Sequence, residues 1–154
     1  MTRTLGVSCT NKFAFLAVVE NGEVLERGPV RIGAARSTDK DKALWETLDT
    51  LKTTIREIAP TRIALLLPGT GEHSKQTHSM MAPRIELETL MRMAAAQIGL
   101  PVNPLTRATV RARLGVTNKG SFDDAVRPAI AESGPYWTAG RLGAAAAAIA
   151  GSGG

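Results

Sequence analysis

Residues 13–24 read FAFLAVVENGEV, an apolar run followed by a tight-turn signal. The uninterrupted apolar run from Phe13 to Val19 predicts a strand that is buried on both faces. Asn21-Gly22 predicts a hairpin, because both central positions of a type I′ turn need positive φ. The strand that returns from this turn, Val24 to Ile32, is therefore antiparallel to the first, and Gly28-Pro29 indicates a bulge or an edge position in it.

The rest of the chain alternates between strands and helices. A short apolar strand, Thr4 to Ser8, precedes the hairpin, and a helix over Thr38–Ile58 follows it, with leucines and isoleucines on one face. The further elements, in order, are a strand at Arg62–Leu67, a loop at 68–82, a helix from Pro83 to Ile98, a strand at Pro101–Pro104, helices at Arg107–Leu114 and from Phe122 to about Glu132, a last helix at Tyr136–Ala150 and a flexible tail at 151–154. Residues 1–150 thus form one domain, and its strand-helix-strand unit is parallel with a right-handed crossover.

The composition fits one basic globular domain. The 154 residues include 44% hydrophobic residues, enough for one core. Nineteen Lys and Arg against fourteen Asp and Glu give a net charge of +5, which permits binding to phosphate backbones. A single cysteine, Cys9, excludes an internal disulfide and a paired-cysteine zinc site. Because we find neither a signal-peptide pattern nor an apolar run of membrane-spanning length, we expect a cytoplasmic protein without membrane association.

Several short segments resemble one known group of proteins. Leu5-Gly6-Val7-Ser8 resembles the first strand of RuvC-like proteins, in which the fourth position is an aspartate. Leu105 to Arg111 resembles their segment after the fifth strand, and Gly115 to Asp123 the glycine- and lysine-containing turn that follows. Arg141 to Ala150 is similar to their final alanine-rich helix. The chain thus resembles the RuvC-like, ribonuclease H-like superfamily, and in layout its small bacterial members that lack the catalytic acids.

The resemblance implies an α/β fold with a five-stranded mixed sheet, three strands antiparallel and the later ones parallel, flanked by helices. It also implies the scaffold of a metal-dependent nuclease. Such cleavage needs several carboxylate oxygens that hold two cations about 4 Å apart. In the family they come from the first strand, the end of the fourth strand and the last helix. Here those places read Ser8, Leu66-Leu67-Pro68 and an acid-free helix, Gly140 to Ala150.

We therefore expect no catalytic residue, no metal and no cofactor, and a domain that binds nucleic acid or a protein partner. Asp123 and Asp124 then serve as helix-capping residues. One alternative is a structure-selective nuclease that uses relocated acids such as Glu20, Glu72 or Asp124 with Mg²⁺ or Mn²⁺. Another is a homo-oligomeric interaction module, for which Trp45 in the first long helix marks a contact.

Two loops carry candidate ligand-binding residues. These are Ser8, Thr10, Asn11, His73 and His78. The two histidines follow the C-terminal end of a strand, where open α/β sheets often bind ligands, and they either bind a metal or belong to a solvated loop. Their spacing matches no standard zinc site. The three turn residues either hold a phosphate or form a plain hairpin turn, since the turn lacks glycine.

A basic stretch free of acids is the candidate surface for DNA or RNA. It comprises Arg107, Arg111, Arg113 and Lys119. Arg107 and Arg111 are four residues apart and share a helical face, whereas Arg113 lies off that face. The stretch either follows a nucleic-acid backbone or is a solvated helix face.

Overall fold

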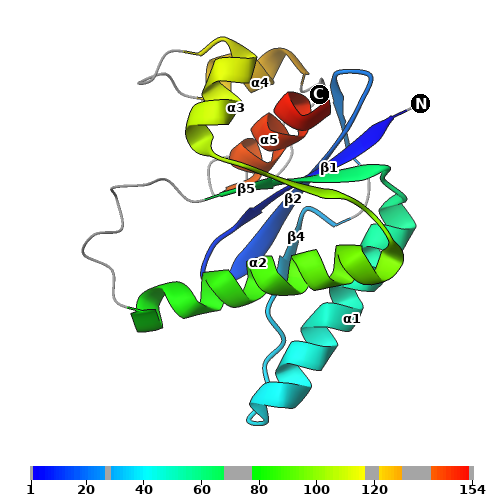
Figure 1. Cartoon of the computed structure of the whole chain (residues 1–154), viewed down its shortest axis with the longest axis vertical. Coiled ribbons are helices and arrows are strands. Elements are labelled where there is room, and N and C mark those ends of the chain that lie inside the picture. The colour runs from blue at the N-terminus through cyan, green and yellow to red at the C-terminus, as the bar shows by residue number, and fades with distance from the viewer. Residues whose placement is uncertain (1, 27–28, 68–77, 117–121, 130–139, 153–154) are drawn as a thin grey trace.

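The computed structural model describes residues 2–26, 29–67, 78–116, 122–129 and 140–152 (Figure 1). Its elements are β1 (Arg3–Cys9), β2 (Phe13–Glu20), β3 (Glu23–Leu25), β4 (Arg31–Gly33), α1 (Lys40–Ile58), β5 (Arg62–Leu66), α2 (His78–Ile98), β6 (Val102–Leu105), α3 (Arg107–Leu114), α4 (Phe122–Val126), a 3-10 turn (Arg127–Ala129) and α5 (Leu142–Ser152). The strands form one mixed sheet in the order β3-β2-β1-β5-β6, with β4 also paired to β2. No helix among the described residues is long and apolar enough to cross a membrane.

The hairpin forms as its sequence predicts. Asn21 and Gly22 both have positive φ, 54° and 77°, and β1 runs antiparallel to β2 from the pair Arg3–Glu20 to the pair Cys9–Ala14. β5 pairs in parallel with β1, and β6 in parallel with β5. The third predicted strand is divided, because β3 and β4 pair separately with β2 on either side of Pro29, which has no N–H to donate. The sheet therefore has six strands rather than five.

Two helical layers cover the sheet (Figure 1), and they meet different kinds of side chain. Because side chains alternate along a strand, β1 directs Leu5, Val7 and Cys9 into the core under α1 and α2, a cluster of leucine, isoleucine, valine and methionine. The opposite face of β1 contacts α5, which supplies a run of fully buried alanines, Ala144 to Ala148. The first core is thus filled by large side chains, whereas the second combines the small residues of α5 with larger ones such as Leu66, Leu105 and Phe122.

The α5 layer depends on a row of small residues across the sheet. Gly6 pairs with Ala17 on one side and with Ala64 on the other. A Cβ atom placed on Gly6 would overlap the backbone oxygen of Ala144 and lie 2.8 Å from the Cβ of Ala148. The absence of a side chain at residue 6 therefore lets the backbone of α5 lie directly on β1.

Several predicted boundaries were wrong. α2 begins at His78 rather than at Pro83, so Pro83 lies inside the helix, where it cannot donate the usual backbone hydrogen bond. The helix at Phe122 ends at Val126 rather than near Glu132 and continues as a 3-10 turn that contains Pro128, since proline does not favour the interior of an α-helix. α5 includes Gly151 and Ser152, which were expected in a flexible tail; Gly151 is buried close to Ala64, where a Cβ atom would lie 2.9 Å from that of Ala64.

Candidate functional site

Three segments meet at the carboxyl edge of the parallel strands. Ser8 of β1 and Leu66 of β5 are register partners, and Gly143 of α5 lies above both. A Cβ atom on Gly143 would lie 2.9 Å from Leu66 Cδ2 and 3.5 Å from Ser8 Oγ. The first strand, the end of the next parallel strand and the last helix therefore converge, as the resemblance to RuvC-like proteins implies. We call Ser8, Leu66 and Gly143 the convergence point.

The convergence point does not fit a two-metal centre. Ser8 supplies a neutral hydroxyl, Leu66 an apolar side chain and Gly143 only a hydrogen atom. The side chains of Ser8 and Leu66 are also buried, with exposed fractions of 7% and 3%. Divalent metals of this kind prefer several charged oxygen ligands. Within the described part of the chain, no group of three or more His, Cys, Asp or Glu residues is placed to hold a metal ion.

Positive charge lies at the start of the same helix. Arg141, only 2% exposed, donates from Nε to the Leu16 carbonyl at 3.2 Å and from Nη2 to Glu26 Oε2 at 3.0 Å. Arg141 precedes Gly143 by two residues, and the N-terminal end of a helix is itself partly positive. Because the charge of Arg141 is paired with Glu26, it is the helix end itself that makes this end of α5 unfavourable for a further cation.

The turn after β1 satisfies its own polar groups. The Thr10 hydroxyl accepts hydrogen bonds from the backbone N–H of Lys12 at 3.3 Å and of Phe13 at 3.1 Å, and the Thr10 N–H donates to the Phe13 carbonyl at 2.8 Å. Asn11 is exposed. These contacts favour the plain hairpin turn over a phosphate-binding loop.

The basic stretch on α3 is divided between two faces. The guanidinium carbons of Arg107 and Arg111 lie 5.9 and 5.3 Å from the centre of the Phe122 ring. Arg113 faces elsewhere and donates from Nη1 to the Ala150 carbonyl at 3.3 Å. The structure thus brings Arg107 and Arg111 together and separates Arg113 from them. Lys119, His73 and the side chain of His78, the first residue of α2, lie outside the described residues.

Sequence reasoning missed one further arginine at this edge, Arg31. Register pairs run across the sheet from Arg31 to Phe15, Ser8, Leu66 and Leu105. With strands about 4.8 Å apart, this row is about 19 Å long. Arg31 stacks at one end, 4.0 Å from the centre of the Phe13 ring, and α3 begins two residues beyond Leu105 at the other. The alternation of side chains along the returning strand is the signal that could have placed Arg31 at this edge. The break at Gly28-Pro29 left the register of that strand undefined.

Of the relocated acids proposed for a nuclease, the structure describes Glu20, which lies away from the convergence point. Glu20 pairs with Arg3 at 3.6 Å, at the opposite end of β1 and β2. Glu72 and the side chain of Asp124 lie outside the described residues.

Cys9 is a buried structural residue. Burial is the main cause that raises the pKa of its thiol to about 12; the nearby Glu88 carboxylate raises it further, and Arg84 lowers it. Burial also raises the pKa of Glu88 itself.

We therefore expect native Cys9 to react with iodoacetamide at pH 8 about a thousandfold more slowly than in the unfolded chain, because only the thiolate is a nucleophile. The rate would be followed by mass spectrometry, with protein in guanidinium chloride as the reference. Similar rates in both states would contradict the buried environment.

Comparison of the whole structure with solved structures identifies its fold. The Thermus thermophilus RuvC in complex with Holliday junction substrate superposes with a TM-score of 0.75 at 15% identity, over 97% of this chain and 92% of that one. The yeast mitochondrial Holliday junction resolvase Ydc2 gives 0.63 at 14% identity, over 99% of this chain and 77% of that one. No protein-family model and no curated protein sequence matches the chain. The fold is ribonuclease H-like, in the RuvC arrangement.

Proposed function

We propose that this chain is a RuvC-like domain that binds nucleic acid without cleaving it. The observation that carries the proposal is the convergence point, where Ser8, Leu66 and Gly143 replace charged ligands with packed neutral atoms. Phosphodiester cleavage by two metals requires carboxylates there. A scaffold that keeps its shape but offers no metal ligands at this point is suited to recognition.

The proposed interface is the edge that holds the convergence point. Arg31 lies at one end of the row of paired residues, and Arg107 and Arg111 follow its other end. Phosphate contacts from arginine supply most of the sequence-independent affinity for nucleic acid. The net charge of +5 acts in the same direction. Two solved proteins of the same fold are a RuvC in complex with Holliday junction substrate and the Holliday junction resolvase Ydc2, which makes branched DNA the first ligand to test.

The deciding experiment combines binding and cleavage on one set of substrates. Four-way junction, duplex DNA, single-stranded DNA and RNA would be titrated at low and moderate salt, with and without Mn²⁺, and then analysed on denaturing gels. We expect saturable, salt-sensitive binding and intact strands. Cleaved strands would show that the protein is a nuclease, contrary to the proposal. A lack of binding at low salt would contradict the role in nucleic-acid recognition.

The variant Arg107→Gln/Arg111→Gln is expected to weaken binding about tenfold or more at low salt. Removing two phosphate contacts should also reduce the slope of log K against log salt by about 1.8, since each contact contributes about 0.9. The measurement is a fluorescence anisotropy titration at several salt concentrations.

Its matched control is Lys42→Gln/Arg56→Gln, which removes the same charge from exposed positions on α1, in the opposite layer. This control should keep most of the affinity. An equal loss in both variants would show that net charge, rather than the α3 surface, governs binding. Melting temperatures would be compared as well, because Arg107 and Arg111 also pack near Phe122.

A further inference from the structure

Two aromatic side chains in the described part of the chain can be reached from solvent. Of the four aromatic residues in those ranges, Phe15 and Phe122 are buried, whereas Phe13 is half-buried and Trp45 is exposed. Proteins bind single-stranded nucleic acid where accessible aromatic rings lie beside positive charge, because bases stack on the rings while the cations hold the phosphates. The charges around Phe13 and Trp45 therefore decide which of them suits a base.

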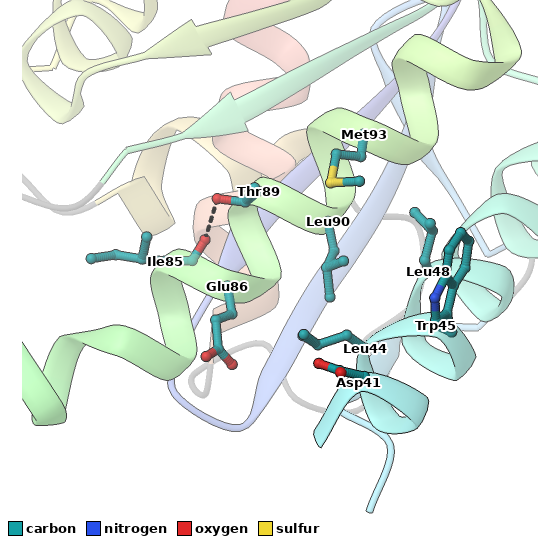
Figure 2. Close-up of a pocket in the computed structure, with 9 residues that line it drawn as sticks. All are labelled: Asp41, Leu44, Trp45, Leu48, Ile85, Glu86, Thr89, Leu90 and Met93. Carbon is teal, nitrogen blue, oxygen red and sulfur yellow. Dashed lines mark hydrogen bonds between the residues drawn. The ribbon is translucent and has the colours of Figure 1, made fainter. Parts of the chain in front are cut away.

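The surroundings of Trp45 do not suit nucleic acid. Trp45 lines a groove of about 460 Å³ between α1 and α2, on the far side of the sheet from α5 (Figures 1 and 2). Its lining is mostly apolar and includes two carboxylates, those of Asp41 and Glu86. Like charges placed together at an interface oppose binding, and every base brings a phosphate with it. Trp45 also lies in the layer opposite the proposed interface.

Phe13 instead lies at a basic corner of the carboxyl edge of the sheet. Arg31 stacks on it, with 4.0 Å between the guanidinium carbon and the centre of the ring. Lys12 is exposed and forms no salt bridge with another described residue. Phe15, whose ring centre is 5.9 Å from that of Phe13, is the register partner of Ser8, so this corner adjoins the convergence point. We call Lys12, Phe13 and Arg31 the basic corner.

The pairing of β2 with β4 explains why Arg31 meets Phe13. Phe13 pairs with Gly33 and Phe15 pairs with Arg31, so Arg31 is the diagonal neighbour of Phe13. Long and aromatic side chains bridge that diagonal separation. Gly33 has no side chain to push the ring aside, and a Cβ atom there would lie 3.3 Å from Phe13 Cε1. The stack is thus fixed by strand register and by a glycine opposite the ring.

The turn before Phe13 fixes the corner before any ligand binds. The Thr10 hydroxyl accepts hydrogen bonds from the backbone N–H of Lys12 and of Phe13, and the Thr10 N–H donates to the Phe13 carbonyl. These bonds engage the backbone of the turn, while the side chains of Asn11 and Lys12 remain exposed. A site that is ordered in advance binds its ligand at a lower entropic cost.

We propose that the basic corner receives an unpaired nucleobase, which stacks on the Arg31–Phe13 pair while Lys12 contacts the adjoining phosphate. This proposal rests on the proposed function and adds the feature of the nucleic acid that is recognised. A paired base is already stacked between its neighbours, so only a base that has left its pair can enter. Bases stack on guanidinium planes as well as on aromatic rings, and such stacking tolerates every base.

The test compares an unpaired base with the same backbone lacking that base. Two DNA duplexes of equal length each carry one unpaired nucleotide at the centre, a deoxyadenosine in one and an abasic unit in the other. The two probes have the same charge and differ only in the base. Fluorescence anisotropy with the whole protein should give a Kd about tenfold lower for the DNA that carries the base, within the range known for stacking of one base.

Phe13→Leu and Arg31→Lys should each lose this tenfold difference. Leucine keeps an apolar side chain without a ring, and lysine keeps the charge without a planar group. Both variants should therefore bind the abasic DNA as the wild type does. The matched control is Arg92→Lys, which makes the same change at an exposed position of α2, in the opposite layer, and should keep the difference. Circular dichroism and melting temperatures would verify that each variant is folded.

The outcomes separate this proposal from the proposed function. Equal affinity of the wild type for the two DNAs would overturn the base site and leave nucleic-acid binding intact. A difference that persists in both Phe13→Leu and Arg31→Lys would also overturn it, because the base would then be recognised elsewhere. Binding to neither DNA would overturn the proposed function and the base site together.

Discussion

Replacing Gly6 with alanine is expected to destabilise the protein by about 3 kcal/mol, at the upper end of what over-packing usually costs. The added methyl group would overlap the Ala144 carbonyl oxygen, which is backbone and cannot rotate away. α5 would have to move off the sheet or β1 would have to bend. In a protein of this size the loss corresponds to a melting temperature about 6–12 °C lower, which differential scanning calorimetry would measure.

Two further variants make the test specific to the contact between β1 and α5. Gly33→Ala adds the same methyl group to a strand residue whose nearest neighbour is the Phe13 ring at 3.3 Å, and it should cost less than about 1 kcal/mol. Ala148→Gly in the Gly6→Ala background should not rescue stability, because the overlap with the Ala144 backbone remains. A melting temperature for Gly6→Ala within 2 °C of the wild type would contradict the packing described.

Leu66→Glu is expected to cost about 4 kcal/mol near pH 7.5, because burial would raise the carboxyl pKa by about three units. The new group would sit at a position 3% exposed, between Ser8 and Gly143. Since its folded-state pKa would exceed the unfolded value of about 4.3, the folded state binds the proton more tightly. The penalty is therefore small near pH 4.5 and grows as the pH rises towards the folded-state pKa.

The control is Leu66→Gln, because glutamine has nearly the same shape as glutamate but cannot ionise. Denaturant unfolding of both variants at pH 5 and pH 7.5 should show a difference that widens with pH. Mn²⁺ should not restore Leu66→Glu, since a single carboxylate beside a serine is a poor site for a divalent cation. Restoration by Mn²⁺ would show that one added carboxylate is enough to hold a metal at the convergence point, and would contradict this prediction.

The fold was predictable because its main signals are local. Asn21-Gly22 set the antiparallel hairpin, and the capping residues Asp39 and Thr106 accept hydrogen bonds from the first turns of α1 and α3. The division into β3 and β4 was not predictable, since Pro29 indicates a disturbance in a strand without giving its register. Nor was the start of α2 at His78, because Pro83 is favoured in the first turn of a helix and here lies inside one.

The site was predictable only in part, for a different reason. The convergence of Ser8, Leu66 and the last helix was expected from the resemblance to RuvC-like proteins, in which the first strand, the end of the fourth strand and the last helix supply one site. The alignment of Arg31 with that edge depends on pairing across a broken strand, which composition and spacing do not encode. The stacking of Arg107 and Arg111 near Phe122 joins α3 to α4, and contacts between separate short helices leave no periodic trace in sequence.

The contact of α5 with the centre of the sheet also has a consequence for how the protein is made. Arg141 is hydrogen-bonded to Leu16, 125 residues earlier, and the alanines that follow cover Gly6. On the ribosome, one apolar face of β1 and β2 therefore stays uncovered until residues 141–152 have emerged. Contacts between such distant segments slow folding and expose strands to aggregation. Nascent chains that stop before residue 141 should thus depend on chaperones that shield apolar surfaces.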